Sequence, residues 1–170
     1  MTEADRNDAR SLAKGVATEF RRRLLGEQLP RIRRCIELLG ESNVWRRPTP
    51  NGNSVGNLVL HLCGNTTQWI LATFGEVADH RDRAAEFAAG EGLPGQALVA
   101  RLEQVYRLAC DVVDTVEVAD LLRTRTVQRR YQETGLAAIL HVLEHCSGHA
   151  GQIYFWTKQV TGKDLAFYDL

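Results

Sequence analysis

Three of the five histidines fall within nine residues, at positions 141, 145 and 149. In an α-helix, residues four apart lie on one face with β-carbons about 5–6 Å apart, so these three would form one line with Gln152 beyond them. Imidazole nitrogens bind metals at about 2.0–2.1 Å, which two histidines one turn apart can satisfy. His141 and His149 are separated by a rise of about 12 Å, too far for one ion. A single ion would therefore take one adjacent pair and a third ligand from elsewhere.

His61 is the candidate for that third ligand. It lies in a strongly apolar segment, with Asn57 one turn before it and Asn65 one turn after it. An unpaired buried polar group costs about 1–3 kcal/mol, so polar lines on two buried helices are expected to face one another. Three neutral imidazoles without a fourth protein ligand leave coordination positions open, as in catalytic rather than structural sites.

The residues alone also allow a cluster of hydrogen-bonded core histidines, because a His-x-x-x-His spacing occurs by chance. The metalloprotease motif HExxH is absent, and Glu144 points about 100° away from His145, so no general-base glutamate beside the ion is indicated. Cys63 and Cys146 lie off the histidine faces by about 200° and 100°, which argues against thiolate ligands. We expect His80 to be a surface or loop residue.

Four helices must position these side chains. Apolar spacing predicts helices over about 9–39, with a kink or break at Pro30, and over 54–74, 95–116 and 134–160. Ser54 and Thr134 are expected to cap the second and fourth helices, and Gly162 to end the last one. Residues 75–95 read as a long connection with room for one helical turn, and 121–133 as a short hairpin or irregular arm. The economical architecture is an all-α four-helix bundle, with residues 1–170 as a single domain.

Composition narrows the function classes. The chain has 21 basic and 21 acidic residues and a pI near 7.0, which argues against a nucleic-acid-binding surface over the whole protein. No apolar stretch approaches the roughly 20 residues of a membrane span, and the N-terminus has no apolar signal core. We therefore expect a cytoplasmic protein with no membrane partner. The four cysteines form no C-x-x-C pair and are expected to be buried small hydrophobes.

Three segments resemble the DinB superfamily of YfiT-like four-helix-bundle proteins, and the likeness covers essentially the whole chain. They are NSVGNLVLHLCGNTTQWI (53–70), DHRDRAAEF (79–87) and LEHCSGHAGQI (143–153). The resemblance implies a metal triad of His61, His145 and His149, which makes His141 a neighbour. Together with Asn57, Asn65 and Gln152, His141 would surround the ligands.

The resemblance further implies a divalent ion (zinc, nickel or iron) and a homodimer. Some such proteins are transferases or isomerases that use a low-molecular-weight thiol, and others are suggested to be hydrolases, so the fold does not decide the reaction. Our first hypothesis is a metal-dependent transferase or hydrolase that activates a bound water or thiolate toward a small-molecule substrate. The alternatives are a non-catalytic metal-binding module, structural or stress-related and dimeric, and a metal-free bundle.

A thiol cofactor would need anion partners. The candidates are basic residues of the long connection and the arm, which can equally be ordinary solvated charges: Arg81, Arg83, Arg125, Arg129 and Arg130. The tryptophans are expected in the core rather than as a substrate platform: Trp45, Trp69 and Trp156.

Overall fold

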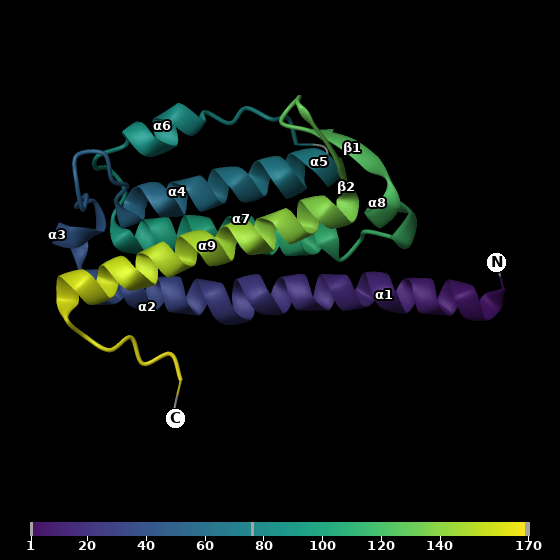
Figure 1. The fold of residues 1–170 in the computed structure, drawn as a ribbon, viewed down its shortest axis with the longest axis horizontal. Helices are drawn as coiled ribbons and strands as arrows, with labels where there is room; N and C mark the ends of the chain where they lie inside the picture. Colours follow the sequence, from purple (N-terminus) through teal and green to yellow (C-terminus); the bar gives the residue numbers. More distant parts are fainter. Residues whose placement is uncertain (1, 76, 169–170) are drawn as a thin grey trace.

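The computed structural model describes residues 2–75 and 77–168. The first rod of the bundle consists of α1 (Glu3–Arg21), the π-helical segment η1 (Arg22–Gln28) and α2 (Leu29–Leu39), which run on as one rod in Figure 1. It begins earlier than position 9 because Thr2 and Asp5 form a capping box. Of the predicted kink or break at Pro30, the break is wrong, because the helical backbone continues through this position. Pro30 lies in the first turn of α2, where a missing N–H is tolerated, and η1 precedes it.

The helices that carry the histidines begin and end where local chemistry predicts. Helix α4 (Val55–Thr66) continues through η2 (Thr67–Leu71) into α5 (Ala72–Phe74), and the Ser54 side chain caps it by accepting from the Asn57 amide. Helix α9 (Gly135–Thr161) is capped by Thr134 and ends at Gly162, whose φ of 64° is left-handed. The third predicted helix is α7 (Gly95–Val113). The expected starts at Ser54 and Thr134, the end at Gly162 and the third helix are confirmed.

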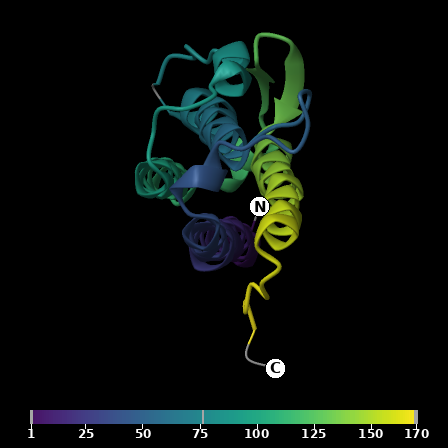
Figure 2. The ribbon, with the colours of Figure 1, turned by 90° about the vertical axis from the view of Figure 1, so that its left-hand side faces the viewer.

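The long helices form a four-helix bundle, as the sequence predicts, and Figure 2 shows it nearly end-on. Helices α4 and α2 each pack against both α7 and α9. The core between them is apolar, and its largest fully buried side chains include Phe20, Leu24, Ile32, Leu62, Ile70, Leu98, Leu102, Tyr106, Ile139 and Ile153. The two site-bearing helices, α4 and α9, therefore lie side by side in a rigid frame.

Short elements connect the long helices. They are α3 (Glu41–Val44), α6 (Arg83–Ala88) and α8 (Val118–Leu122), followed by the strands β1 (Thr124–Val127) and β2 (Tyr131–Thr134). Helix α6 is the predicted turn within 75–95 and packs on the outside of α4 (Figure 1). The strands confirm the hairpin and pair antiparallel, with Val127 opposite Tyr131. In the turn between them, Gln128 and Arg129 both have left-handed backbone, at φ 55° and 56°.

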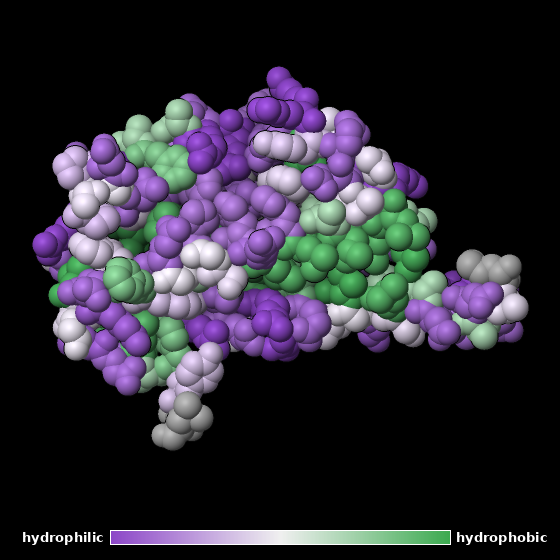
Figure 3. Space-filling view, viewed as in Figure 1, coloured by the Kyte–Doolittle hydropathy of each residue, from purple (hydrophilic) through white to green (hydrophobic). Residues whose placement is uncertain are grey.

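One face of the bundle is markedly apolar. Figure 3 shows a hydrophobic region where the first half of α9 lies above α1. The exposed large side chains on these two helices include Leu12, with 60% of its surface exposed, and Leu140, with 53%. Within the part of the chain that the structure describes, no helix is long and apolar enough to cross a membrane.

Candidate metal centre

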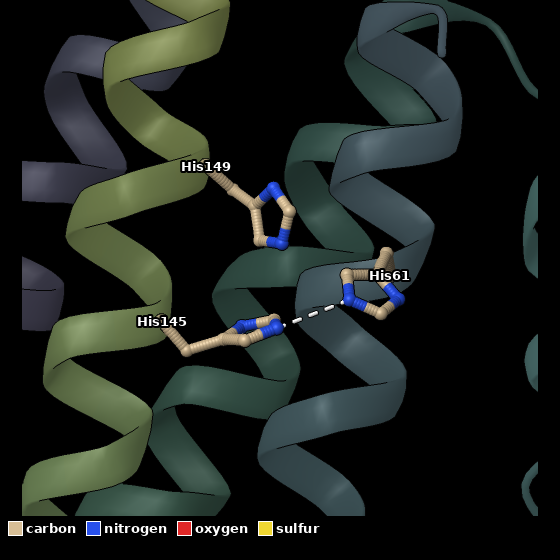
Figure 4. Close-up of side chains that lie close together, drawn as sticks. All are labelled: His61, His145 and His149. Atoms are coloured by element: carbon tan, nitrogen blue, oxygen red, sulfur yellow. Dashed lines mark hydrogen bonds between the residues drawn. The ribbon is translucent and has the colours of Figure 1, made fainter. Parts of the chain in front are cut away.

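The structure brings His61, His145 and His149 together between α4 and α9 (Figure 4). One ring nitrogen from each lies within 4.8 Å of the other two. The Nε2 atoms of His61 and His145 are 3.1 Å apart. His61 is buried, whereas the two α9 histidines are half-buried. The predicted juxtaposition of one histidine from 54–74 with an adjacent pair from 134–160 is thus present.

The two α9 histidines are neutral donors. Burial, and then the neighbouring imidazoles, lower the pKa of His145 to about 3. Burial also lowers the pKa of His149, and its hydrogen bond to Gln152 offsets this only in part. A metal binds the neutral form of imidazole, so protons do not compete for these nitrogens near neutral pH. The Nδ1 atom of His145 is buried without a hydrogen-bond partner.

A buried ion pair lies on the far side of the His61 ring. Glu86 Oε2 is 2.9 Å from His61 Nδ1. Arg81 donates two hydrogen bonds to the same carboxylate, from Nε to Oε1 at 2.7 Å and from Nη2 to Oε2 at 2.9 Å. Burial by itself raises the pKa of Glu86, but the hydrogen bonds from His61 and Arg81 outweigh it and hold the pKa below its usual value. Glu86 is therefore an ionised acceptor behind His61.

The connection that carries this pair is built into the bundle. Arg81 Nη1 donates to Gln68 at 2.9 Å, and Gln68 donates to Asp79 at 2.7 Å. Asp79 in turn accepts from the Arg81 amide at 3.1 Å. Arg81, one of the candidate anion partners for a thiol cofactor, is thus a buried partner of Glu86 and Gln68.

Gly64 explains how the connection approaches so closely. A β-carbon at this position of α4 would collide with Glu86 Oε1 and lie 2.8 Å from Arg81 Nε. A glycine one turn from the middle of an apolar helix weakens the helix slightly, by about 1 kcal/mol relative to alanine. Here it opens the space that the ion pair occupies.

Asn57 faces a different neighbour from the one that the sequence suggests. Its Nδ2 donates to the backbone carbonyls of Glu86 at 2.9 Å and Ala89 at 2.6 Å, while its Oδ1 accepts from Ser54. The sequence suggests that Asn57 faces α9 together with His61 and Asn65, and this is wrong. Helix α4 is buried on several sides, so Asn65 faces α9 whereas Asn57 faces α6. Asn57 fixes α6, not α9.

His141, at the start of the line of histidines on α9, packs against its neighbours and is not one of the three converging donors. His141 Nε2 lies 3.2 Å from Asn65 Nδ2, and its ring stacks on Trp69 with centroids 3.6 Å apart and planes at 18°. Tyr131 of the hairpin stacks on the outer side of Trp69, at 6.3 Å. His141 lies outside the group of three converging donors, as the family resemblance implies, whereas the helical rise alone allows either adjacent pair. Trp69 is a core residue, as expected, and its ring packs against His141.

An open groove of about 430 Å³ runs along the α9 side of the centre. It is lined by His141, Glu144, His145, Gly148, His149 and Gln152. Gln152 Oε1 lies 3.3 Å from His149 Nδ1, so His149 donates there and its Nε2 is left free. The groove gives a small molecule direct access to the two α9 histidines.

The remaining candidates are not among the three converging donors. Cys63 and Cys146 are buried in the core, where burial raises their pKa values to about 12 and about 11, so they are neutral thiols outside the ligand group. His80 is exposed in the connection, as expected. Arg125 pairs with Asp120 at 2.7 Å, and Arg83 lies over the Phe87 ring at 4.8 Å.

Sequence reasoning missed Glu86 and Phe87, whose ring lies 4.6 Å from that of His61. The sequence feature that could have indicated these two residues is the alternation of charges in 79–87, which ends in an apolar residue. That pattern is equally typical of an exposed loop.

Comparisons with known proteins agree with this architecture. A structure described as the crystal structure of a conserved protein from Enterococcus faecalis matches with a TM-score of 0.63 and 16% identity, over 90% of this chain and 97% of that one. At that identity the likeness shows the fold alone. No curated protein matches the chain. The family model described as "Protein of unknown function (DUF1572)" matches residues 17–169, so the chain belongs to this DinB-like family.

Proposed function

We propose that the protein binds one divalent metal ion through His61, His145 and His149 and acts as a metal-dependent enzyme on a small molecule. The observation that carries this proposal is the convergence of three imidazole donors within 4.8 Å of one another. Imidazole ligands suit zinc, nickel and iron alike. The donor chemistry fits such an ion because the nitrogens of His145 and His149 are neutral and His61 Nδ1 is already engaged by Glu86.

The residues around the centre would each serve the bound ion in a distinct way. Glu86 and Gln152 orient His61 and His149 by accepting from their Nδ1 atoms, which directs both Nε2 atoms inward. When bound, the ion would supply Lewis acidity at neutral pH. The groove beside His145 and His149 admits the substrate, and the three protein donors leave coordination positions for it.

Two reaction classes compete for this arrangement. One is a transferase that uses a low-molecular-weight thiol, and the other is a hydrolase. Assays of the metal-loaded protein with a thiol and an electrophile, and separately with esters and amides, distinguish them. A non-catalytic alternative is a bundle in which the ion ties α4 to α9, because the three histidines bridge these helices. An ion in that role is needed for folding, whereas a catalytic ion can be removed with the bundle intact.

Metal analysis of the purified protein and of His61→Ala tests the ligand set. We expect about one ion per chain in the wild type and none in the variant. His80→Ala is the matched control, because His80 is an exposed histidine of the connection, and it should keep its metal. Stoichiometric metal in His61→Ala would refute the triad.

Two further expectations stay predictions. The protein is expected in the cytoplasm and as a homodimer, and the apolar region where α9 lies above α1 supports self-association. Light scattering on the purified chain measures its mass in solution, and a monomer at micromolar concentration would count against the dimer.

A further inference from the structure

The ion pair behind His61 has a chemical consequence for the ring itself. We propose that Glu86 is a positioning residue that holds the proton of His61 on Nδ1, which keeps the Nε2 lone pair directed at His145 and His149. This inference rests on the proposed metal site, since it concerns how one of its ligands is kept ready.

The argument starts from the two nitrogens of a neutral imidazole, of which one donates and the other accepts. Arg81 donates to both oxygens of Glu86, which places this carboxylate as an acceptor, so its contact of 2.9 Å with Nδ1 places the proton there. Arg81 Nη2 lies 3.0 Å from the same Nδ1 and can only donate, which would favour the opposite form. The hydrogen bond to the carboxylate prevails, because it satisfies all three groups: the Nδ1 proton goes to Glu86 Oε2, and the two hydrogens of Arg81 Nη2 go to Oε2 at 2.9 Å and to the His61 carbonyl at 3.5 Å.

The role of Arg81 is to stabilise the carboxylate of Glu86, not to bind the His61 ring. The side chains of Arg81 and Glu86 are only 6% and 11% exposed. A carboxylate buried this far needs a partner to stay ionised, and the two contacts from one guanidinium supply it. Asn57 fixes the backbone carbonyl of Glu86, and Gly64 leaves room for the pair. The segment 79–89 thus completes the centre from outside the two helices that carry the histidines.

Glu86→Gln tests the proposal with a change of one atom type. The amide nitrogen can take the place of Oε2 and donate to His61 Nδ1, while the amide oxygen keeps the shorter contact with Arg81 Nε at 2.7 Å. The proton of His61 would then move to Nε2 and cover the lone pair that should bind the metal. We expect the dissociation constant for Zn²⁺ to rise about 10–100-fold.

Two measurements report on this change. Nitrogen NMR of the histidine rings in the metal-free protein distinguishes the tautomers, and we expect Nδ1–H for His61 in the wild type and Nε2–H in Glu86→Gln. Competition with a chromophoric chelator gives the Zn²⁺ dissociation constants. Glu91→Gln is the control, because Glu91 is an exposed carboxylate of the same connection. It removes one negative charge and should leave both readouts unchanged.

Gly64→Ala provides a second route that removes no functional group and covers the case in which Glu86→Gln fails to fold. The added methyl group displaces the end of the Glu86 side chain, a flexible group that can move while α4 stays helical. We expect weaker Zn²⁺ binding and a mixture of His61 tautomers. Gly15→Ala on α1, where a β-carbon meets nothing within 4 Å, is the matched control and should bind like the wild type.

The outcomes separate this inference from the function on which it rests. If the wild type binds none of Zn²⁺, Ni²⁺ and Fe²⁺, the proposed function fails, and the tautomer measurement still decides the role of Glu86. If the wild type binds Zn²⁺ and Glu86→Gln binds it equally well with His61 still protonated on Nδ1, the positioning role is overturned while the metal site stands. An Nε2–H tautomer in the metal-free wild type also overturns it.

Discussion

Asn57→Ala should destabilise the protein although Asn57 touches none of the three histidines in the metal centre. The side chain is fully buried and makes four hydrogen bonds, two with Ser54 and one each to the carbonyls of Glu86 and Ala89. At about 0.5–1.5 kcal/mol per bond, the loss amounts to roughly 2–6 kcal/mol, less up to about 0.7 kcal/mol for the better helix propensity of alanine. For a chain of this size, each kcal/mol corresponds to about 2–4 °C in Tm.

Asn57→Asp separates the two halves of this network. The carboxylate keeps the acceptor for Ser54 and suits the first turn of a helix, but it cannot donate to the carbonyls of Glu86 and Ala89. The second carboxylate oxygen would also face these two carbonyl oxygens without a proton between them and repel them, so we expect Asn57→Asp to be about as destabilising as alanine in urea unfolding followed by circular dichroism. Asn51→Ala, at an exposed loop position, is the control and should stay within about 0.5 kcal/mol of the wild type. Wild-type stability in Asn57→Asp would show that the contacts with α6 carry no energy, and the reasoning would fail.

Three other predictions concern the histidines, the metal and the thiols. His141→Ala should keep one ion per chain in metal analysis, because its ring packs on Trp69 outside the converging donors; loss of metal would make it a ligand. Removing the ion with a chelator should leave the helical circular dichroism spectrum unchanged and lower Tm only by the lost binding energy, since the core is apolar and independent of the centre. The native protein should resist iodoacetamide at pH 8, because burial raises all four thiol pKa values to about 11 or 12. The unfolded protein should take up four labels, as counted by mass spectrometry, and rapid labelling of the folded chain would contradict this. These thiols are Cys35, Cys63, Cys110 and Cys146.

The helices could be predicted because their signals are local. Ser54, Thr134 and Gly162 act through hydrogen bonds and backbone angles within one turn of themselves. Ser54 and Thr134 begin their helices and Gly162 ends the last one, as expected. The first helix is the exception. Its earlier start comes from a capping box that hydrophobic spacing does not register, and Pro30 is accommodated in a first turn that follows a π-helical segment.

The centre could be predicted only as far as helical spacing reaches. His145 and His149 share a face because they are four apart, and His61 stands out as a histidine in an apolar helix. Glu86 is 25 residues from His61 along the chain and joins it through a connection without periodicity. The direction of Asn57 was equally hidden, since a helix buried on most sides offers several faces to a polar residue. Contacts of this kind depend on how a loop folds back, which single-residue patterns do not encode.

The hairpin turn offers a place to engineer a sturdier protein. Gln128 and Arg129 occupy left-handed backbone, which costs a residue with a β-carbon about 1–2 kcal/mol and suits asparagine and glycine far better. Two strands alone are marginally stable, and here the second strand carries Tyr131, whose ring lies on Trp69. An Asn-Gly turn at 128–129 would therefore stabilise the hairpin that holds Tyr131 beside Trp69 without altering any side chain that lines the groove.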